Sequence, residues 1–208
     1  MTLTEAVEAR RSVRSFLDRP VPRTSIERAL ALAVQAPAPH HSAPWRFVLL
    51  EGPEAKSSFS AAMGAAWAQD LAADGLPAEK IEGILGRSHA LLTSTPLLTV
   101  CCANVERAHS YPDERRRLAE HTLFAHAIGA ALQTYMLALA ADGIASCWIS
   151  APAFCGNVVR DHLGLGEHVE PHALVLVGYA SPDYTPRSRP PARAAGFILQ
   201  TGSLGRHE

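Results

Sequence analysis

Apolar residues along the chain follow two spacings, one typical of helices and one typical of buried strands. Segments with helical spacing lie at about 3–11, 24–34, 53–73, 78–92, 114–141 and 152–163. Short continuous apolar runs lie at about 45–50, 96–103, 144–149 and 173–179. The pattern therefore predicts a protein that contains both helices and buried strands.

Two of the predicted helices begin with a possible capping box. Thr2-x-x-Glu5 and Thr24-x-x-Glu27 have the serine or threonine and the glutamate at the spacing that lets each cap the other's backbone N–H. Pro37 ends the second helix, and the following stretch up to about residue 44 is predicted as a loop because its prolines are unsuited to a helix or a central strand.

The longest predicted helix runs from about Glu114 to Ala141, and its centre is rich in alanine, leucine and isoleucine. A helix that is apolar on almost all sides should be buried on most faces. We prefer a dimer interface as the explanation, because one small domain can hardly cover such a helix alone. The alternative is a central helix that is covered entirely within one chain.

Composition limits the classes of protein to consider. The chain has 208 residues, of which 48% are hydrophobic and 19% charged, and this predicts a single domain over 1–208 with a C-terminal arm over about 181–208. The formal net charge of −1 argues against nucleic-acid binding. The N-terminus has no signal-peptide pattern, and no uncharged apolar run long enough to span a membrane was expected.

The four cysteines do not form a C-x-x-C pair. Cys101 and Cys102 are adjacent inside an apolar run, and Cys147 and Cys155 stand alone. This pattern predicts buried, reduced thiols, and it favours a cytoplasmic location.

An unusual cluster of arginines stands near the N-terminus. The stretch from Ala9 to Phe16 holds Arg10, Arg11 and Arg14 together with two serines. Guanidinium groups that leave a helix and lie along a cleft are suited to bidentate binding of a phosphate. The alternative is a solvated basic helix end that complements the helix dipole.

Several catalytic motifs are absent from the sequence. It has no P-loop, no G-x-G-x-x-G after a strand, no G-x-S-x-G and no H-E-x-x-H. His40 and His41 are adjacent, and His121 and His126 point in different directions on a helix. The sequence therefore predicts no metal site and no catalytic side chain, which favours chemistry supplied by a cofactor.

Taken in order, several motifs resemble the nitroreductase family of flavin enzymes. They are Arg10–Phe16, Pro44-Trp45-Arg46-Phe47, the strand from Gly143 to Ile149, and Gly178-Tyr179 followed by Arg187. The resemblance covers about residues 8–199. It implies an α+β fold with a mixed central sheet flanked by helices, in an intertwined homodimer that binds FMN.

One branch resembles the chain more closely, namely the C-terminal nitroreductase-like domain of the bifunctional coenzyme F-420 glutamyl ligase. The motifs that carry this likeness are Pro37–His41, Trp67–Leu71, Asp74–Pro77, His109–Asp113 and Glu120–Thr122. The ligase half is absent. Ala38, His41 and Ala43 stand where many members of the broad family have serine, asparagine and glutamine.

The resemblance also implies roles for individual residues. The residues implied to contact FMN are Arg10, Arg11, Ser12, Val13, Arg14, Ser146, Trp148, Ile149 and Arg187. Those implied to contact the substrate are His40, His41, Arg46 and Asp70. The first arginines and Arg187 (or Arg189) would hold the phosphate, and Arg14 would lie at the pyrimidine edge of the ring.

The implied activity is hydride transfer through the flavin N5 atom, with a deazaflavin related to coenzyme F-420 as the expected acceptor. One alternative is a broad NAD(P)H-dependent nitro or quinone reductase. Others are a flavin or deazaflavin carrier without turnover, and an enzyme related to synthesis of the cobalamin lower ligand.

Overall fold

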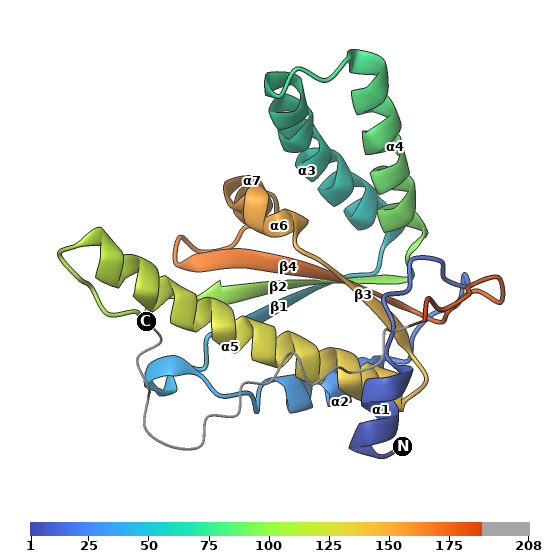
Figure 1. Cartoon of the computed structure of the whole chain (residues 1–208), viewed down its shortest axis with the longest axis horizontal. Helices are drawn as coiled ribbons and strands as arrows, with labels where there is room; N and C mark the ends of the chain where they lie inside the picture. Colours follow the sequence, from blue (N-terminus) through green and yellow to red (C-terminus); the bar gives the residue numbers. More distant parts are fainter. Residues whose placement is uncertain (189–208) are drawn as a thin grey trace, which may run out of the picture.

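Residues 1–188 are described by a computed structural model, in which helices cover both faces of a four-stranded sheet (Figure 1). A hairpin of two helices projects from one side of this body (Figure 1). From Arg189 onward the predicted C-terminal arm lies outside the described residues, and so does the expected contact of Arg189 with the phosphate.

The sheet has the order β1-β2-β4-β3, and each neighbouring pair of strands is antiparallel. Its strands are β1 Trp45–Leu50, β2 Leu97–Asn104, β3 Ala145–Ile149 and β4 Val169–Gly178. A parallel element is added at the edge by an isolated bridge between Ser12 and Ser146. The α+β fold class is confirmed, and the four predicted strands are all present.

The helices agree with most of the predicted ranges. They are α1 Leu3–Ala9, α2 Arg23–Ala33, the 3₁₀ turn η1 Pro39–His41, α3 Pro53–Ala73, α4 Ala78–Ser94, α5 Glu114–Ala141, α6 Ala151–Phe154 and α7 Gly156–His162. The capping box of α1 is confirmed, because the Thr2 and Glu5 side chains each accept a hydrogen bond from the other's backbone N–H.

Two local predictions are wrong. The second capping box does not form, because α2 begins at Arg23, one residue before Thr24, and Glu27 pairs with Arg23 instead. The single helix predicted over 152–163 is two short helices, because the backbone leaves the helical conformation at Cys155 (φ −129°, ψ 40°).

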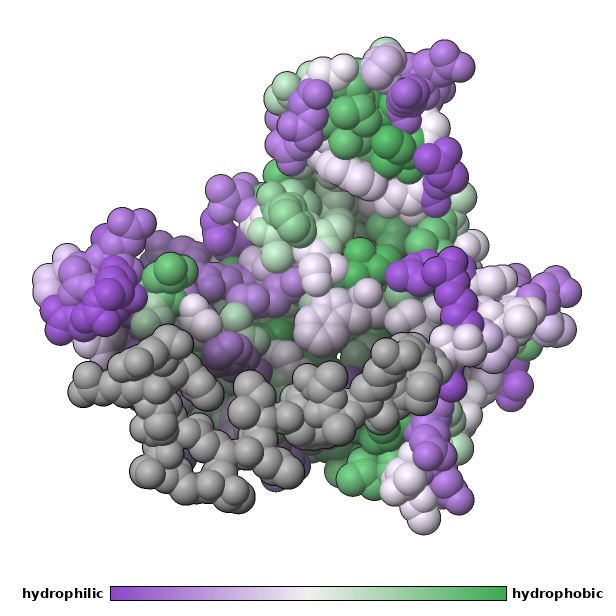
Figure 2. Space-filling view, in the orientation of Figure 1, coloured by the Kyte–Doolittle hydropathy of each residue, from purple (hydrophilic) through white to green (hydrophobic). Residues whose placement is uncertain are grey.

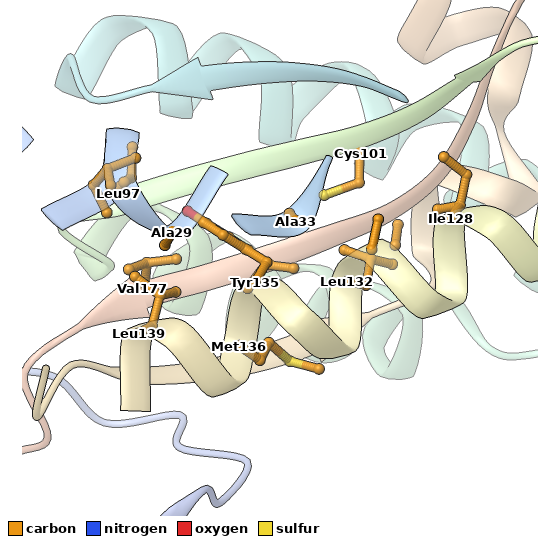
Figure 3. Packing of buried hydrophobic residues seen from close by; sticks show 14 of the residues in the cluster. Ala29, Ala33, Leu97, Cys101, Ile128, Leu132, Tyr135, Met136, Leu139 and Val177 are labelled. Carbon is orange, nitrogen blue, oxygen red and sulfur yellow. The ribbon is translucent and has the colours of Figure 1, made fainter. Parts of the chain in front are cut away.

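One face of the sheet packs against α5 and α2, as Figure 3 shows. Tyr135 and Leu132 of α5 are fully buried there, and the Tyr135 hydroxyl lies 3.0 Å from the Thr99 hydroxyl of β2. Side chains alternate along a strand, so Cys101 belongs to this face while its neighbour Cys102 belongs to the other. The alternation explains how two adjacent cysteines are both buried and both free.

The opposite face of the sheet packs against α7 and against the base of the α3–α4 hairpin (residues 53–94). Phe59 and Met63 of α3 and Leu92 of α4 are buried in this second cluster. Figure 2 shows hydrophobic residues on the surface of the projecting hairpin, in line with its partial burial.

Helix α5 is 28 residues long, and among the described helices it alone has the length and apolar composition of a membrane span. This finding contradicts the expectation that no apolar run is long enough to span a membrane. One side of the helix forms the core against the sheet, whereas Leu118 and Leu123 on another side are exposed. Within residues 1–188, a single copy therefore leaves part of the N-terminal half of α5 uncovered, while the apolar centre from Ala125 to Ala140 is largely buried or half-buried. The dimer interface stays a prediction.

Candidate functional site

The arginine stretch lies along the edge of the sheet. After α1 ends at Ala9, the backbone N–H of Val13 donates a hydrogen bond to the carbonyl of Ser146 in β3 (3.0 Å). Further on, the Ser181 N–H donates to the carbonyl of Ser15 (2.9 Å). Val13 is buried, and its neighbours Ser12 and Arg14 are exposed, so the extended backbone holds their side chains at the surface.

Five of the predicted FMN contacts meet at one cavity of about 590 Å³. Its lining includes Arg10, Arg11, Ser12, Arg14 and Arg187. Arg187 comes from the far end of the chain and reaches this cavity because residues 180 and 181 pair with the arginine stretch. Four guanidinium groups around one opening favour binding of an anion.

Two buried polar atoms near this cavity lack a hydrogen-bond partner among residues 1–188. They are the Nε of Arg11 and the Oγ of Ser146. Both residues line a neighbouring cavity of about 320 Å³, which also includes Arg10. Buried donors are rarely left unpaired, so the arrangement fits a ligand that supplies acceptors, such as a phosphate with its attached polyol chain.

The positive charges also act on the thiol of Cys147 in β3. Burial raises the pKa of Cys147, and Arg14 and Arg10 act in the opposite direction. The net result is a pKa above the ordinary value, so the thiol stays protonated at neutral pH. Cys147 is therefore a core residue and has no reactive thiolate.

The strand β3 connects the arginine cavities to a second region. Ser146 lines the arginine side, while Ile149 lines a cavity of about 510 Å³ together with Trp67 and Asp70 of α3. Trp148 lies between them in sequence, is 38% exposed, and donates from its indole N–H to the Ser150 hydroxyl (3.0 Å). Asp70 is thus placed at an apolar cavity that shares a strand with the arginine site.

The other predicted substrate contacts lie elsewhere in the chain. His40 and His41 are in η1, and Arg46 is in β1, where its guanidinium donates to the carbonyls of Ala43 (3.3 Å) and Trp45 (2.8 Å). None of the three lines the cavities described above. A single copy therefore does not unite them with Asp70.

Sequence reasoning missed the partners of His40. The His40 Nε2 atom lies 2.7 Å from Oε1 of Glu120, a buried carboxylate on α5 that also accepts from the backbone N–H of His109 (2.9 Å). Burial alone would raise the pKa of Glu120, but the hydrogen bonds from His109 and His40 outweigh it and hold the pKa below its usual value. Both partners stand in stretches used above for the family resemblance, yet nothing in their spacing indicates contact.

The fold is that of an α+β protein with a cationic cavity at the edge of its sheet. A model of the nitroreductase family matches residues 7–179, so the chain belongs to the nitroreductase family. This result confirms the broad resemblance and the expectation of an enzyme of the nitroreductase type.

Individual relatives agree with this family. The chain is 28% identical over 192 residues to the iodotyrosine deiodinase of Drosophila melanogaster, covering 85% of this chain but only 62% of that protein. It is 26% identical over 206 residues to the NADH dehydrogenase of Thermus thermophilus, covering 88% of each.

Among solved structures, the fold matches that of a variant of the FMN- and NADPH-dependent nitroreductase NfnB from Sphigopyxis sp. strain HMH. The TM-score is 0.69 at 23% identity, and the match covers 97% of this chain and 100% of that chain. At this identity the likeness supports the fold alone.

Proposed function

We propose that this protein is a homodimeric, FMN-dependent oxidoreductase that passes hydride from NAD(P)H to a small acceptor. The observation that carries the proposal is the cavity lined by Arg10, Arg11, Ser12, Arg14 and Arg187, beside the unpaired Arg11 Nε and Ser146 Oγ atoms. The proposal is supported by the two relatives named above as an NADH dehydrogenase and as an FMN- and NADPH-dependent nitroreductase.

The four arginines of the cavity each have a role in this proposal. Arg10, Arg11 and Arg187 bind the phosphate, and the exposed Arg14 provides positive charge for the ring. When bound, FMN supplies two-electron hydride chemistry that the chain's own side chains lack. Ser146 contributes an unpaired hydroxyl to the wall of the site. The chain's own residues therefore bind, orient and polarise the flavin.

A second copy of the chain completes the site in this proposal. A single copy leaves Leu118 and Leu123 of α5 exposed, and the exposed residues farther along the helix include the polar His126 and Gln133. A second copy packed against this mixed surface would remove the two leucines from water. Such packing gives a route for His40, His41 and Arg46 of one copy to reach the cavity of the other.

The identity of the natural electron acceptor is a separate part of the proposal. A deazaflavin related to coenzyme F-420 stays a prediction, based on the motifs around His40, Asp70 and His109. A broad acceptor range, with nitro compounds or quinones, is the alternative prediction, and membership of the nitroreductase family supports nitro compounds among these acceptors. The cytoplasmic location likewise stays a prediction.

The binding test uses Arg11→Ala, since removing a charge-assisted contact to phosphate costs about 1.5–3 kcal/mol, or about ten- to a hundred-fold in affinity. The purified variant should be colourless, and its FMN affinity, measured by quenching of flavin fluorescence, should fall by that factor. Arg23→Ala is the matched control, because Arg23 pairs with Glu27 on the exposed side of α2. Full FMN loading of Arg11→Ala would refute the assigned cavity.

The acceptor test uses the yellow wild-type protein without air. NADPH or NADH should bleach the flavin absorption, and a nitroaromatic, a quinone or an oxidised deazaflavin should restore it. Restoration by the deazaflavin alone would establish the narrower prediction. A flavin that no donor reduces would instead indicate a carrier, contrary to the proposal.

A further inference from the structure

Three side chains that are distant in sequence meet beside the N-terminal half of α5. His40 comes from η1, His109 from the loop after β2, and Glu120 from α5 itself. One ligand atom from each residue lies within 4.8 Å of the others. The two imidazole rings stack, with centroids 3.9 Å apart and planes 24° apart.

We propose that His40, His109 and Glu120 form a binding site for a divalent cation of the zinc type. Two imidazole nitrogens and one carboxylate oxygen are a donor set that suits Zn²⁺, Co²⁺ or Ni²⁺, whereas Mg²⁺ and Ca²⁺ prefer oxygen ligands alone. Three protein ligands leave a coordination position for water or substrate, as in catalytic zinc sites.

Metal binding requires the two rings to turn and separate. Ligand atoms about 2.1 Å from a tetrahedral zinc lie about 3.4 Å apart, so the His40–Glu120 contact of 2.7 Å must open slightly. The lone pair of an imidazole nitrogen lies in the plane of its ring, so the stacked rings of His40 and His109 must also turn before both nitrogens face one ion. Because His40 and His109 are exposed while Glu120 is buried, the carboxylate is the fixed ligand and the rings make the adjustment.

The backbone around His40 is held in an unusual conformation. His40, His41 and Ala43 have φ values of 54°, 51° and 47°, in the left-handed region that non-glycine residues rarely adopt. Such strain costs about 1–3 kcal/mol per residue and persists only where the surroundings enforce it. In this proposal the strain orients the His40 ring toward Glu120 and His109.

A purely structural role is the competing explanation. A buried glutamate that accepts hydrogen bonds from a histidine ring and a backbone N–H could simply hold η1 against α5. The two explanations differ in whether exchangeable metal binds with a defined coordination number. The site shares His40 with the predicted substrate contacts but shares no residue with the cavity proposed for FMN, so FMN binding and metal binding can fail independently.

The test uses the full chain, purified without a histidine tag and stripped with a chelator. Co²⁺ should bind at one ion per chain and give the intense visible bands of four- or five-coordinate cobalt, and Zn²⁺ should displace it. His109→Ala and Glu120→Gln should each weaken Co²⁺ binding at least ten-fold, by direct loss of a ligand. His121→Ala is the control, because His121 contacts Glu170 outside the cluster.

Because His109 is exposed, His109→Ala should fold even if Glu120→Gln does not. Circular dichroism measures whether each variant is folded. The proposal fails if the wild type shows only the weak bands of hexaaqua cobalt. It also fails if His109→Ala keeps the intense bands unchanged. FMN content, measured in the same samples, should be the same in His109→Ala and in wild type.

Discussion

The helix α5 and the α3–α4 hairpin are both long and apolar, but they are stabilised differently. Buried residues occur along most of α5, from Glu120 to Leu139, where the helix lies on the sheet. In the hairpin, the buried residues are confined to its base, namely Lys56, Phe59, Ser60, Met63 and Leu92. Between the outer halves of α3 and α4 lies an open cavity of about 790 Å³, lined largely by small and apolar side chains.

The difference shows which part of the molecule contributes most to the free energy of folding and which part can open locally. Free energy of folding is concentrated where apolar side chains leave water completely, which here is the contact between α5 and the sheet. The outer hairpin has few such contacts, so its local opening should need much less free energy than global unfolding. It also borders the cavity lined by Asp70, one of the residues predicted to contact the substrate.

The largest expected effect comes from a matched pair of leucine truncations. Leu132→Ala in the fully buried face of α5 should lower the free energy of unfolding by about 3–5 kcal/mol, because it leaves a cavity in a packed core. Leu85→Ala in the half-buried outer part of α4 should cost less than about 1 kcal/mol. Urea unfolding followed by circular dichroism measures both, and equal losses would contradict the comparison.

A smaller effect is expected at the base of the hairpin. The buried ammonium of Lys56 in α3 donates a hydrogen bond to the Thr95 carbonyl at the end of α4 (2.6 Å). Lys56→Met keeps the apolar stem but removes the donor, and it should cost about 1–2 kcal/mol of unfolding free energy. The control is Lys80→Met on the exposed side of α4, which should be neutral within about 0.5 kcal/mol. A neutral Lys56→Met would show that the base does not depend on this contact.

The smallest effect is a pH dependence at the junction of the two regions. His172 is the extra residue at the bulge of β4, and it lines a cavity with residues of α3 and α7. Burial lowers the pKa of His172 below 6.5, with Glu170 opposing this and His121 adding to it. The unfolded chain therefore binds the proton more readily, and stability should fall as the pH drops below 6.5 toward the lowered pKa.

This prediction is checked by chemical unfolding at a series of pH values between about 5 and 8. His172→Gln should flatten the loss of stability below pH 6.5 relative to wild type, whereas His168→Gln, at an exposed position, should not. An unchanged slope in His172→Gln would assign the pH dependence to other groups.

Much of the fold could be predicted from local patterns. The bounds of α3 and α5 follow from proline and aspartate at their starts and from apolar spacing, and the strands follow from their continuous apolar runs. The predictions at Thr24 and Cys155 were wrong because a short motif is compatible with a cap or a helix but does not determine the first residue of the helix. At Thr24 the start is shifted to Arg23, and at Cys155 a new helix begins.

The site was only partly predictable, for a physical reason. The arginine cluster is contiguous, so its shared cavity could be anticipated, and the late Arg187 could be added only through the family resemblance. The contact of His40 with Glu120 depends on how η1 packs against α5, over a separation of 80 residues. The sequence places His40 beside His41 but gives no sign of its contact with Glu120, so it predicts no metal site there.

Gly178 at the end of β4 has a consequence for the placement of the arginines. A Cβ atom there would lie 2.9 Å from both Phe16 and Pro96, closer than real contacts allow. The hydrogen side chain is thus what lets the N-terminal segment seat fully against the sheet, and even a methyl group would push Phe16 outward. The position of the guanidinium groups is therefore adjustable through one uncharged residue that lines neither arginine cavity.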